Sequence, residues 1–342
     1  KLLLHIRSRN RIYPKDSASP LIPLTIKKKS TLMHRRHLIS SAFAAAVSAA
    51  GVTQASTIDQ FEGKTRPVDT MNRVKGWQPG AVEPIEIKGR SIGTGRPKLI
   101  APTTAKTPDD LVATVKHFAA MKALDMIEVR IDYLGRLEPK QYADVTRRAY
   151  EAAGDKIVLV TLRNGTDGGP FIAEDDYYGE VYEAVLTEGR ADIVDIELFR
   201  DAAMVRRLVD TAHKKGVKVI ISDHEFKFTP DEGELIRRLL LEQEAGADIL
   251  KLAVMAASPE DALTVMNATA KVRHYYSNRP MLTMAMGKWG VLTRITGEGF
   301  GSDLTFASVG GKASAPGQIP AEDCLNVLEV LHKAMNLSLI HI

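Results

Sequence analysis

The feature that most constrains the fold is a regular alternation of short apolar runs with longer amphipathic segments. The apolar runs have the length of buried strands, and the amphipathic segments have the length and period of crossover helices. The runs lie at residues 98–101, 126–131, 157–161, 193–197, 217–222, 249–253, 281–286 and 304–307. The main amphipathic segments lie at residues 107–121, 141–153, 201–215, 232–245 and 259–274. Strands that alternate with helices predict an α/β protein built on a parallel sheet.

Such a sheet is either closed into a barrel or open. Eight strand–helix units over about 240 residues fit a (β/α)8 TIM barrel. The alternative, an open doubly wound sheet, normally carries a Gly-rich phosphate loop after its first strand, and Ala101-Pro-Thr-Thr has none. We therefore predict one barrel over residues 85–336. A short β-hairpin at 85–92, turning at Lys88-Gly89, precedes the first barrel strand.

Three helix starts carry capping chemistry. Thr107, Thr229 and Ser258 each stand directly before a proline and an acidic pair. A hydroxyl side chain caps a helix, and proline is favoured at the first helical position. We expect a helix to begin directly after each of the three.

The charge is distributed unevenly. The net charge is +4, but residues 1–55 hold ten Lys or Arg and one Asp, a local charge of +9. The remainder therefore carries −5, and a body with this balance has no general electrostatic reason to bind nucleic acid. The single cysteine, Cys324, excludes an intramolecular disulfide framework.

The basic leader has the pattern of an export signal. Arg35-Arg36 precede a small-residue apolar stretch that ends at Ala55, which resembles a twin-arginine signal and is too short for a stable membrane anchor. We predict an upstream arm and export signal at 1–55, a linker at 56–84 and a non-native tail at 337–342. The expected location is periplasmic. The alternative to an export signal is that the leader forms an Ala-rich amphipathic helix. If the leader is not used for export, the protein is cytoplasmic.

Polar residues gather where the predicted strands end. Because active sites of barrels lie at the carboxyl ends of the strands, these side chains are the candidates for function. They are Glu128, Arg130, Arg163, His224, Lys251, Arg294, Ser314 and Gln318.

Lys251 interrupts the run Ala247-Asp-Ile-Leu-Lys251-Leu-Ala-Val, which otherwise suits a buried strand. A buried ammonium group is costly. Lys251 is therefore either an amine whose lowered pKa lets it attack a carbonyl, or a lysine paired with a carboxylate at the barrel rim. His224 follows an apolar strand and is either a general base or a capping and packing histidine.

The other candidates also have two interpretations. Glu128 and Arg130 alternate on one strand face, where they bind substrate hydroxyls or pair with each other. Arg163 precedes a Gly-bearing loop that is either functional or a simple turn. Arg294 forms a fork to a carboxylate or a surface ion pair. The loop with Ser314 and Gln318 offers donors or is merely a turn. The chain has no HExxH, Cys-pair, Walker or GxGxxG motif, so we predict no metal and no organic cofactor.

Together the motifs resemble type I 3-dehydroquinate dehydratase, a Schiff-base lyase on a (β/α)8 barrel. The resemblance runs from about Ile85 to Ala334. It is carried, in order, by Glu128-Val-Arg130, Arg163 with the following Asp-Gly-Gly, Ser222-Asp-His-Glu-Phe, Ala247-Asp-Ile-Leu-Lys251, Met286-Gly with Arg294, Gly299-Phe-Gly-Ser, and Lys312-Ala-Ser-Ala-Pro-Gly-Gln318.

The resemblance implies roles for these residues. Lys251 would form an iminium with the C3 ketone of 3-dehydroquinate, and His224 would move the C2 proton and assist loss of the C1 hydroxyl. Arg294, helped by Ser314 and Gln318, would hold the carboxylate. The remaining three, Glu128, Arg130 and Arg163, would contact the ring hydroxyls.

Two positions depart from the family pattern. The family usually has Glu where this chain has Asp167, the partner of the histidine, and it often has Ser where this chain has Pro102.

The predicted function is dehydration of 3-dehydroquinate to 3-dehydroshikimate, in the shikimate pathway or in quinate breakdown. The alternatives are another class I Schiff-base lyase or aldolase, or a periplasmic protein that binds small acids. The expected partner is a small-molecule substrate, with a homodimer as the expected assembly.

Overall fold

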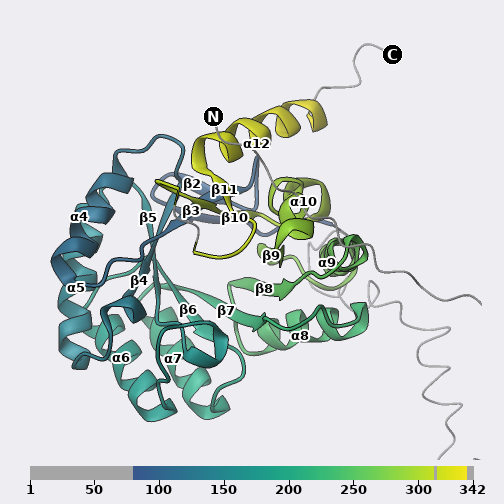
Figure 1. Cartoon of the computed structure of the whole chain (residues 1–342). Coiled ribbons are helices and arrows are strands. Elements are labelled where there is room, and N and C mark those ends of the chain that lie inside the picture. The colour runs from purple at the N-terminus through teal and green to yellow at the C-terminus, as the bar shows by residue number, and fades with distance from the viewer. Residues whose placement is uncertain (1–79, 312–313, 337–342) are drawn as a thin grey trace, which may run out of the picture. The chain divides into compact units, whose positions relative to one another are not determined.

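The computed structural model describes residues 80–311 and 314–336, and a curled parallel sheet ringed by helices forms its centre (Figure 1). The sheet order is β11-β10-β3-β4-β5-β6-β7-β8-β9. The eight barrel strands are β3 (Lys98–Pro102), β4 (Met126–Arg130), β5 (Ile157–Thr161), β6 (Ile193–Glu197), β7 (Lys218–Glu225), β8 (Ile249–Met255), β9 (Met281–Met286) and β10 (Leu304–Ser308). All eight strands that the sequence predicts are therefore confirmed.

The sheet closes as a barrel and not as an open sheet. Each strand from β3 to β8 pairs in parallel with the next along the chain, and β10 returns to pair with β3 through Leu304 and Lys98. The seam between β9 and β10 is held by individual bonds: the Asp303 amide donates to the Met281 carbonyl at 2.7 Å, and the Thr283 amide donates to Ser302 Oγ at 3.0 Å. The short β11 (Ile319–Pro320) extends β10 on its other side.

The helices cover the outer face of the barrel (Figure 1). They are α4 (Pro108–Ala119), α5 (Pro139–Ala152), α6 (Asp175–Thr187), α7 (Ala202–Lys214), α8 (Glu232–Glu244), α9 (Pro259–Lys271), α10 (Val291–Ile295), α11 (Gly297–Phe300) and α12 (Ala321–Met335). Apolar side chains form two layers, one between strands and helices and one inside the barrel. Alternation along the strands produces both, because successive side chains point outward and inward.

The predicted hairpin is confirmed and closes one end of the barrel. Strands β1 (Ile85–Ile87) and β2 (Arg90–Ile92) pair antiparallel around Lys88 and Gly89, whose φ angles are 49° and 72°. Two consecutive positive φ angles are typical of the two-residue turn that matches strand twist. Ile85 and Ile92 pack on the inner apolar layer, so the hairpin covers the amino-terminal ends of the strands.

Two of the three predicted helix caps are confirmed. Thr107 and Ser258 accept hydrogen bonds from the amides of Asp110 and Asp261. The prediction for Thr229 is wrong, because Asp231 caps α8 instead and accepts from the Glu234 amide at 2.9 Å. The Thr229 hydroxyl donates to the Met255 carbonyl at 2.8 Å, which ties it to β8 and moves the helix start along the chain to a carboxylate cap.

Several predictions concern residues that the structure does not describe. The arm and export signal at 1–55, most of the linker at 56–84 and the tail at 337–342 lie outside the described residues. Among the helices of the described part, none is long and apolar enough to cross a membrane.

Candidate active site

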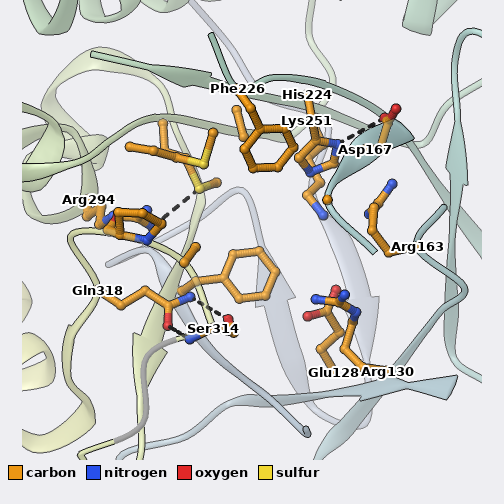
Figure 2. Close-up of a pocket in the computed structure, with 17 residues that line it drawn as sticks. Glu128, Arg130, Arg163, Asp167, His224, Phe226, Lys251, Arg294, Ser314 and Gln318 are labelled. Atoms are coloured by element: carbon orange, nitrogen blue, oxygen red, sulfur yellow. Dashed lines mark hydrogen bonds and ion pairs between the residues drawn. The ribbon is translucent and has the colours of Figure 1, made fainter. Parts of the chain in front are cut away.

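A cavity of about 100 Å³ opens at the carboxyl ends of the barrel strands. A buried water needs roughly 10–15 Å³, so the cavity has room for a small molecule. All nine residues that the sequence predicts for the site line it: Glu128, Arg130, Arg163, Asp167, His224, Lys251, Arg294, Ser314 and Gln318. In Figure 2, Arg294 and Gln318 lie on one side of the cavity, Glu128 and Arg130 lie on the other, and Lys251 with His224 lies between them.

Lys251 lies in the middle of β8 with its side chain inside the barrel, 3% exposed. Its Nζ lies 2.6 Å from Asp195 Oδ2. The lysine therefore has a carboxylate partner, as one of the two interpretations of the sequence expected. The pair is buried within the barrel and not at its rim, and Lys251 still lines the cavity.

Asp195 is the main residue of this site that the sequence analysis missed. It lies on β6, is fully buried, and also contacts Arg163 Nη2 at 2.7 Å and the Ser222 hydroxyl at 2.6 Å. Burial favours a higher pKa for its carboxyl, but the charges of Arg163 and Lys251 outweigh burial and hold the pKa well below its usual value. The alternation Asp195-Ile-Glu197 on a predicted strand places both carboxylates on one face, and this was the available signal.

Arg163 connects these carboxylates to the cavity. It is buried at the end of β5, and besides Asp195 it contacts Glu197 Oε1 through Nη1 at 3.1 Å. The same Glu197 oxygen accepts the Asn164 amide at 2.8 Å, which fixes the chain that leaves β5. Arg163 is therefore a rigid, permanently charged wall of the cavity, because guanidinium groups stay protonated.

His224 lies within β7 and not after it, which corrects the shorter strand that the sequence predicted. Burial lowers the pKa of its imidazole to about 4, and the positive charge of Arg163 contributes in the same direction. Asp167 acts in the opposite direction but does not overcome these effects. The imidazole is therefore neutral at pH 7 and can accept a proton.

Asp167 faces His224 across a long contact. Its Oδ2 lies 3.4 Å from His224 Nδ1, at the outer limit of a hydrogen bond (Figure 2). Phe226 stacks beside the imidazole and covers the loop of Asp167, where a Cβ at Gly168 (φ +86°) would lie 2.6 Å from the Phe226 ring. Burial tends to raise the pKa of Asp167, but His224 and Arg163 hold it below its usual value, so the carboxylate is charged.

Glu128 and Arg130 share the inward face of β4, as predicted, but do not pair with each other. Arg130 makes two bonds of 2.8 Å to the buried carboxylate of Asp132. Glu128 Oε1 accepts the Thr161 hydroxyl at 2.8 Å. Because each has its own partner outside the cavity, both are held in place for contact with a ligand.

Arg294 is a buried cation with no carboxylate partner among the residues that the structure describes. It lies on α10, is 1% exposed, and donates through Nη2 to the Pro316 carbonyl at 3.0 Å. Its Nε has no hydrogen-bond partner within residues 80–311 and 314–336. The alternative of a surface ion pair is therefore wrong. Burial lowers the pKa of Arg294 to about 10, and it remains charged at pH 7.

Ser314 and Gln318 form a small rigid unit beside Arg294. Gln318 Nε2 donates to Ser314 Oγ at 2.9 Å, and the Ser314 amide donates to Gln318 Oε1 at 2.9 Å. The unit leaves a hydroxyl and an amide at the cavity wall. A guanidinium without a counter-ion next to such donors is suited to bind a carboxylate.

The cavity combines an amine, a neutral imidazole and two unequal polar sides. An amine and a base in one enclosed space can form a covalent imine with a ketone and move protons beside it. No group of three His, Cys, Asp or Glu residues in the described part of the chain is placed to hold a metal ion.

Comparison with known proteins gives a consistent result. The sequence profile of the family described as type I 3-dehydroquinase matches residues 99–335. The chain is 40% identical over 251 residues to 3-dehydroquinate dehydratase of Syntrophotalea carbinolica, which covers 72% of this chain and 98% of that protein. It is 38% identical over 253 residues to the protein of the same name from Clostridioides difficile, covering 74% and 98%.

Solved structures agree with the sequence relatives. The type I 3-dehydroquinate dehydratase of Clostridium difficile with covalently modified comenic acid has a TM-score of 0.70 and 36% identity, covering 74% of this chain and 99% of that one. The 3-dehydroquinate dehydratase of Enterococcus faecalis has a TM-score of 0.68 and 31% identity, covering 72% and 99%.

Proposed function

This chain belongs to the type I 3-dehydroquinase family and is a 3-dehydroquinate dehydratase, and we propose that it works through a Schiff base on Lys251 with His224 as general acid and base. The observation that carries the mechanism is the placement of Lys251 Nζ in the same cavity as a neutral imidazole. A solved relative whose name includes covalently modified comenic acid supports a covalent mechanism in this family.

The reaction begins at Lys251. Its ammonium must lose a proton, and the neutral His224 is the base available in the cavity. The free amine attacks the C3 ketone of 3-dehydroquinate, and the protonated His224 returns its proton to the departing oxygen, so that water leaves as the iminium forms and the imidazole is neutral again. Asp195, which stays ionised, stabilises the positive iminium nitrogen in place of the ammonium.

The elimination then needs one proton to move twice. The iminium withdraws electrons from C2, so that His224 can remove the C2 proton and leave an enamine. The protonated imidazole returns a proton to the C1 hydroxyl, which departs as water. Hydrolysis of the new iminium releases 3-dehydroshikimate and consumes the water lost in imine formation, so the net change is loss of one water.

The two sides of the cavity orient the substrate. The guanidinium of Arg294, which has no carboxylate partner among the described residues, binds the carboxylate together with Ser314 and Gln318. Across the cavity, Glu128 and Arg130 contact the ring hydroxyls. Binding both ends holds C3 against Lys251, and such positioning supplies much of the catalysis in reactions of this kind.

The test is to incubate the purified full chain with 3-dehydroquinate and follow the absorbance of the enone product. We expect enone to form, and borohydride added during turnover to leave a covalent adduct on the protein. Carbon–carbon cleavage would indicate an aldolase, and binding without turnover would indicate a binding protein. Turnover with no adduct at saturating substrate would argue against the Schiff base.

Asp167, beside His224, is expected to influence how kcat/KM depends on pH. Because its negative charge raises the pKa of His224, Asp167→Asn should lower that pKa further and move the acid limb of kcat/KM to lower pH. It should also lower kcat, because the imidazole loses its orienting partner. Asp167→Glu keeps the charge and can shorten the 3.4 Å contact, so we expect its limb and its rate to match or exceed the wild type.

The measurement is kcat/KM against pH for the wild type and both variants. An acid limb that stays in place in Asp167→Asn would show that this carboxylate does not influence the histidine.

We also propose that the protein is exported, on the basis of its leader sequence alone. Arg35-Arg36 and the weakly apolar stretch that follows are typical of the twin-arginine route. Export would suit breakdown of external quinate better than aromatic biosynthesis.

Fractionation of bacteria that express the full chain tests this proposal. We expect activity in the periplasm and a new N-terminus near residue 56, and cytoplasmic activity for Arg35→Lys/Arg36→Lys. Uncut, cytoplasmic wild-type protein would refute export, and a double variant that is still exported would refute the twin-arginine route.

A further inference from the structure

Glu242 is a buried carboxyl group that the proposed chemistry does not use. It lies on α8, the helix between the strand of His224 and the strand of Lys251, and it is fully buried. Its Oε2 accepts the backbone amide of Lys251 at 2.7 Å. Its Oε1 is buried without a hydrogen-bond partner among the described residues.

The position of Glu242 is one that packing alone would fill with an apolar side chain. The other buried residues of α8 are Leu235 and Leu239, which stand seven and three positions before it on the same face. Both belong to the apolar layer between strands and helices. A carboxyl in that layer with one unpaired oxygen costs stability, so its single bond to Lys251 is its evident contribution.

That bond gives Lys251 a second attachment, on a different element from the first. The Nζ group contacts Asp195 on β6 at 2.6 Å, inside the barrel. The amide is bonded to Glu242, which reaches β8 from the surrounding helices. The lysine is therefore held at its main chain by α8 and at its tip by β6. A nucleophile fixed in this way stays at the angle and distance that attack on a carbonyl needs.

The carboxyl acts through its oxygen and not through a charge. Burial raises the pKa of Glu242 well above its usual value, and the nearby carboxylates of Asp223 and Asp195 add to this effect. The charged form is disfavoured there, so little counter-charge acts on the Lys251 ammonium from this side.

We propose that Glu242 is a positioning residue for the reaction, which holds the main chain of Lys251 so that its amine is correctly placed to form the Schiff base. The inference rests on the proposed function of Lys251. It assigns no contact between Glu242 and the substrate, because Glu242 does not line the cavity.

Three substitutions of Glu242 separate the effects of side-chain length, charge and volume. Glu242→Gln keeps an oxygen at the same distance without a charge. Glu242→Asp keeps the acid but is one methylene too short to reach the amide. Glu242→Met removes the acceptor and keeps the volume. Leu239→Met is the matched control, a similar change in the same layer at a residue with no bond to Lys251.

The readouts are kcat, KM and the rate of borohydride trapping with 3-dehydroquinate, alongside thermal unfolding. We expect Gln and the Leu239→Met control to stay within about threefold of the wild-type kcat. Asp and Met should lose about tenfold or more in kcat and in trapping rate with little change in KM, because misplacement by about 1 Å can cost 10²-fold.

Three results would overturn the inference: a folded Asp or Met variant with wild-type kcat and trapping, a Gln variant as impaired as Met, or an effect confined to KM. If Met does not fold, the comparison of Asp with Gln still decides. Failure of the proposed function is recognised separately, since the wild type itself would then give no adduct.

Discussion

Lys251→Ala is expected to abolish dehydration and borohydride trapping while the protein stays folded. Removing the amine removes the covalent electron sink, and no other lysine lines the cavity formed by the described residues. The fold should survive, because Asp195 keeps its contacts with Arg163 at 2.7 Å and with the Ser222 hydroxyl at 2.6 Å. The buried carboxylate is then still paired, and a buried charge is strongly destabilising only when it is unpaired.

The matched control is Lys227→Ala, which removes an exposed amine two positions beyond the end of β7 and should leave activity unchanged. Turnover, trapping mass and thermal unfolding are measured for both variants. A Lys251→Ala protein that kept about a tenth of the wild-type turnover would contradict the Schiff-base assignment, because the variant has no amine at this position to form the covalent intermediate.

His224→Ala is expected to slow turnover by about 10²–10⁴, the usual contribution of a general acid–base group. The adduct should still be trapped, but more slowly, because Lys251 remains while the base that deprotonates it is gone. The pH dependence carries the sharper result. Burial lowers the pKa of His224 to about 4, so the wild-type kcat/KM should fall as the pH drops through about 4 and the imidazole becomes protonated. The variant should lack this limb.

His213→Ala serves as the control, because His213 pairs with Asp248 on the outside of the barrel and does not line the cavity. The His213→Ala variant should keep both the wild-type turnover rate and the acid limb of kcat/KM. If His224→Ala retained normal turnover, the proton would have to be moved by another group.

The sequence predicted the strands well because each buried strand of a parallel barrel is a short apolar run flanked by turn residues. It also predicted most of the cavity lining, because a polar residue such as Lys251 inside such a run is conspicuous. The error at Thr229 has a local cause. A hydroxyl before proline suits a cap, but only the tertiary bond to Met255 shows that Thr229 is used elsewhere.

The partners of the site residues were harder to predict. Asp195 was visible as a charge on a predicted strand, but its contacts with Arg163 and Lys251 join β6 to β8 and to the chain that leaves β5, which are distant in sequence. Arg294 could not be identified from its neighbours in the chain as a buried cation without a carboxylate partner in the described part of the protein, because it is covered by the loop that contains Pro316. Charge pairing inside a barrel is a property of register, which periodicity alone does not specify.

The hairpin of β1 and β2 affects how substrate enters the enzyme and how product leaves it. Together with the inner layer of isoleucine and methionine side chains, it fills the end of the barrel opposite the cavity. Substrate and product therefore use the same opening, at the carboxyl ends of the strands. Each molecule of 3-dehydroshikimate leaves by the route along which the next 3-dehydroquinate enters. The hairpin that turns at Lys88 and Gly89 thus contributes to limiting access, from the far end of the barrel relative to the reacting atoms.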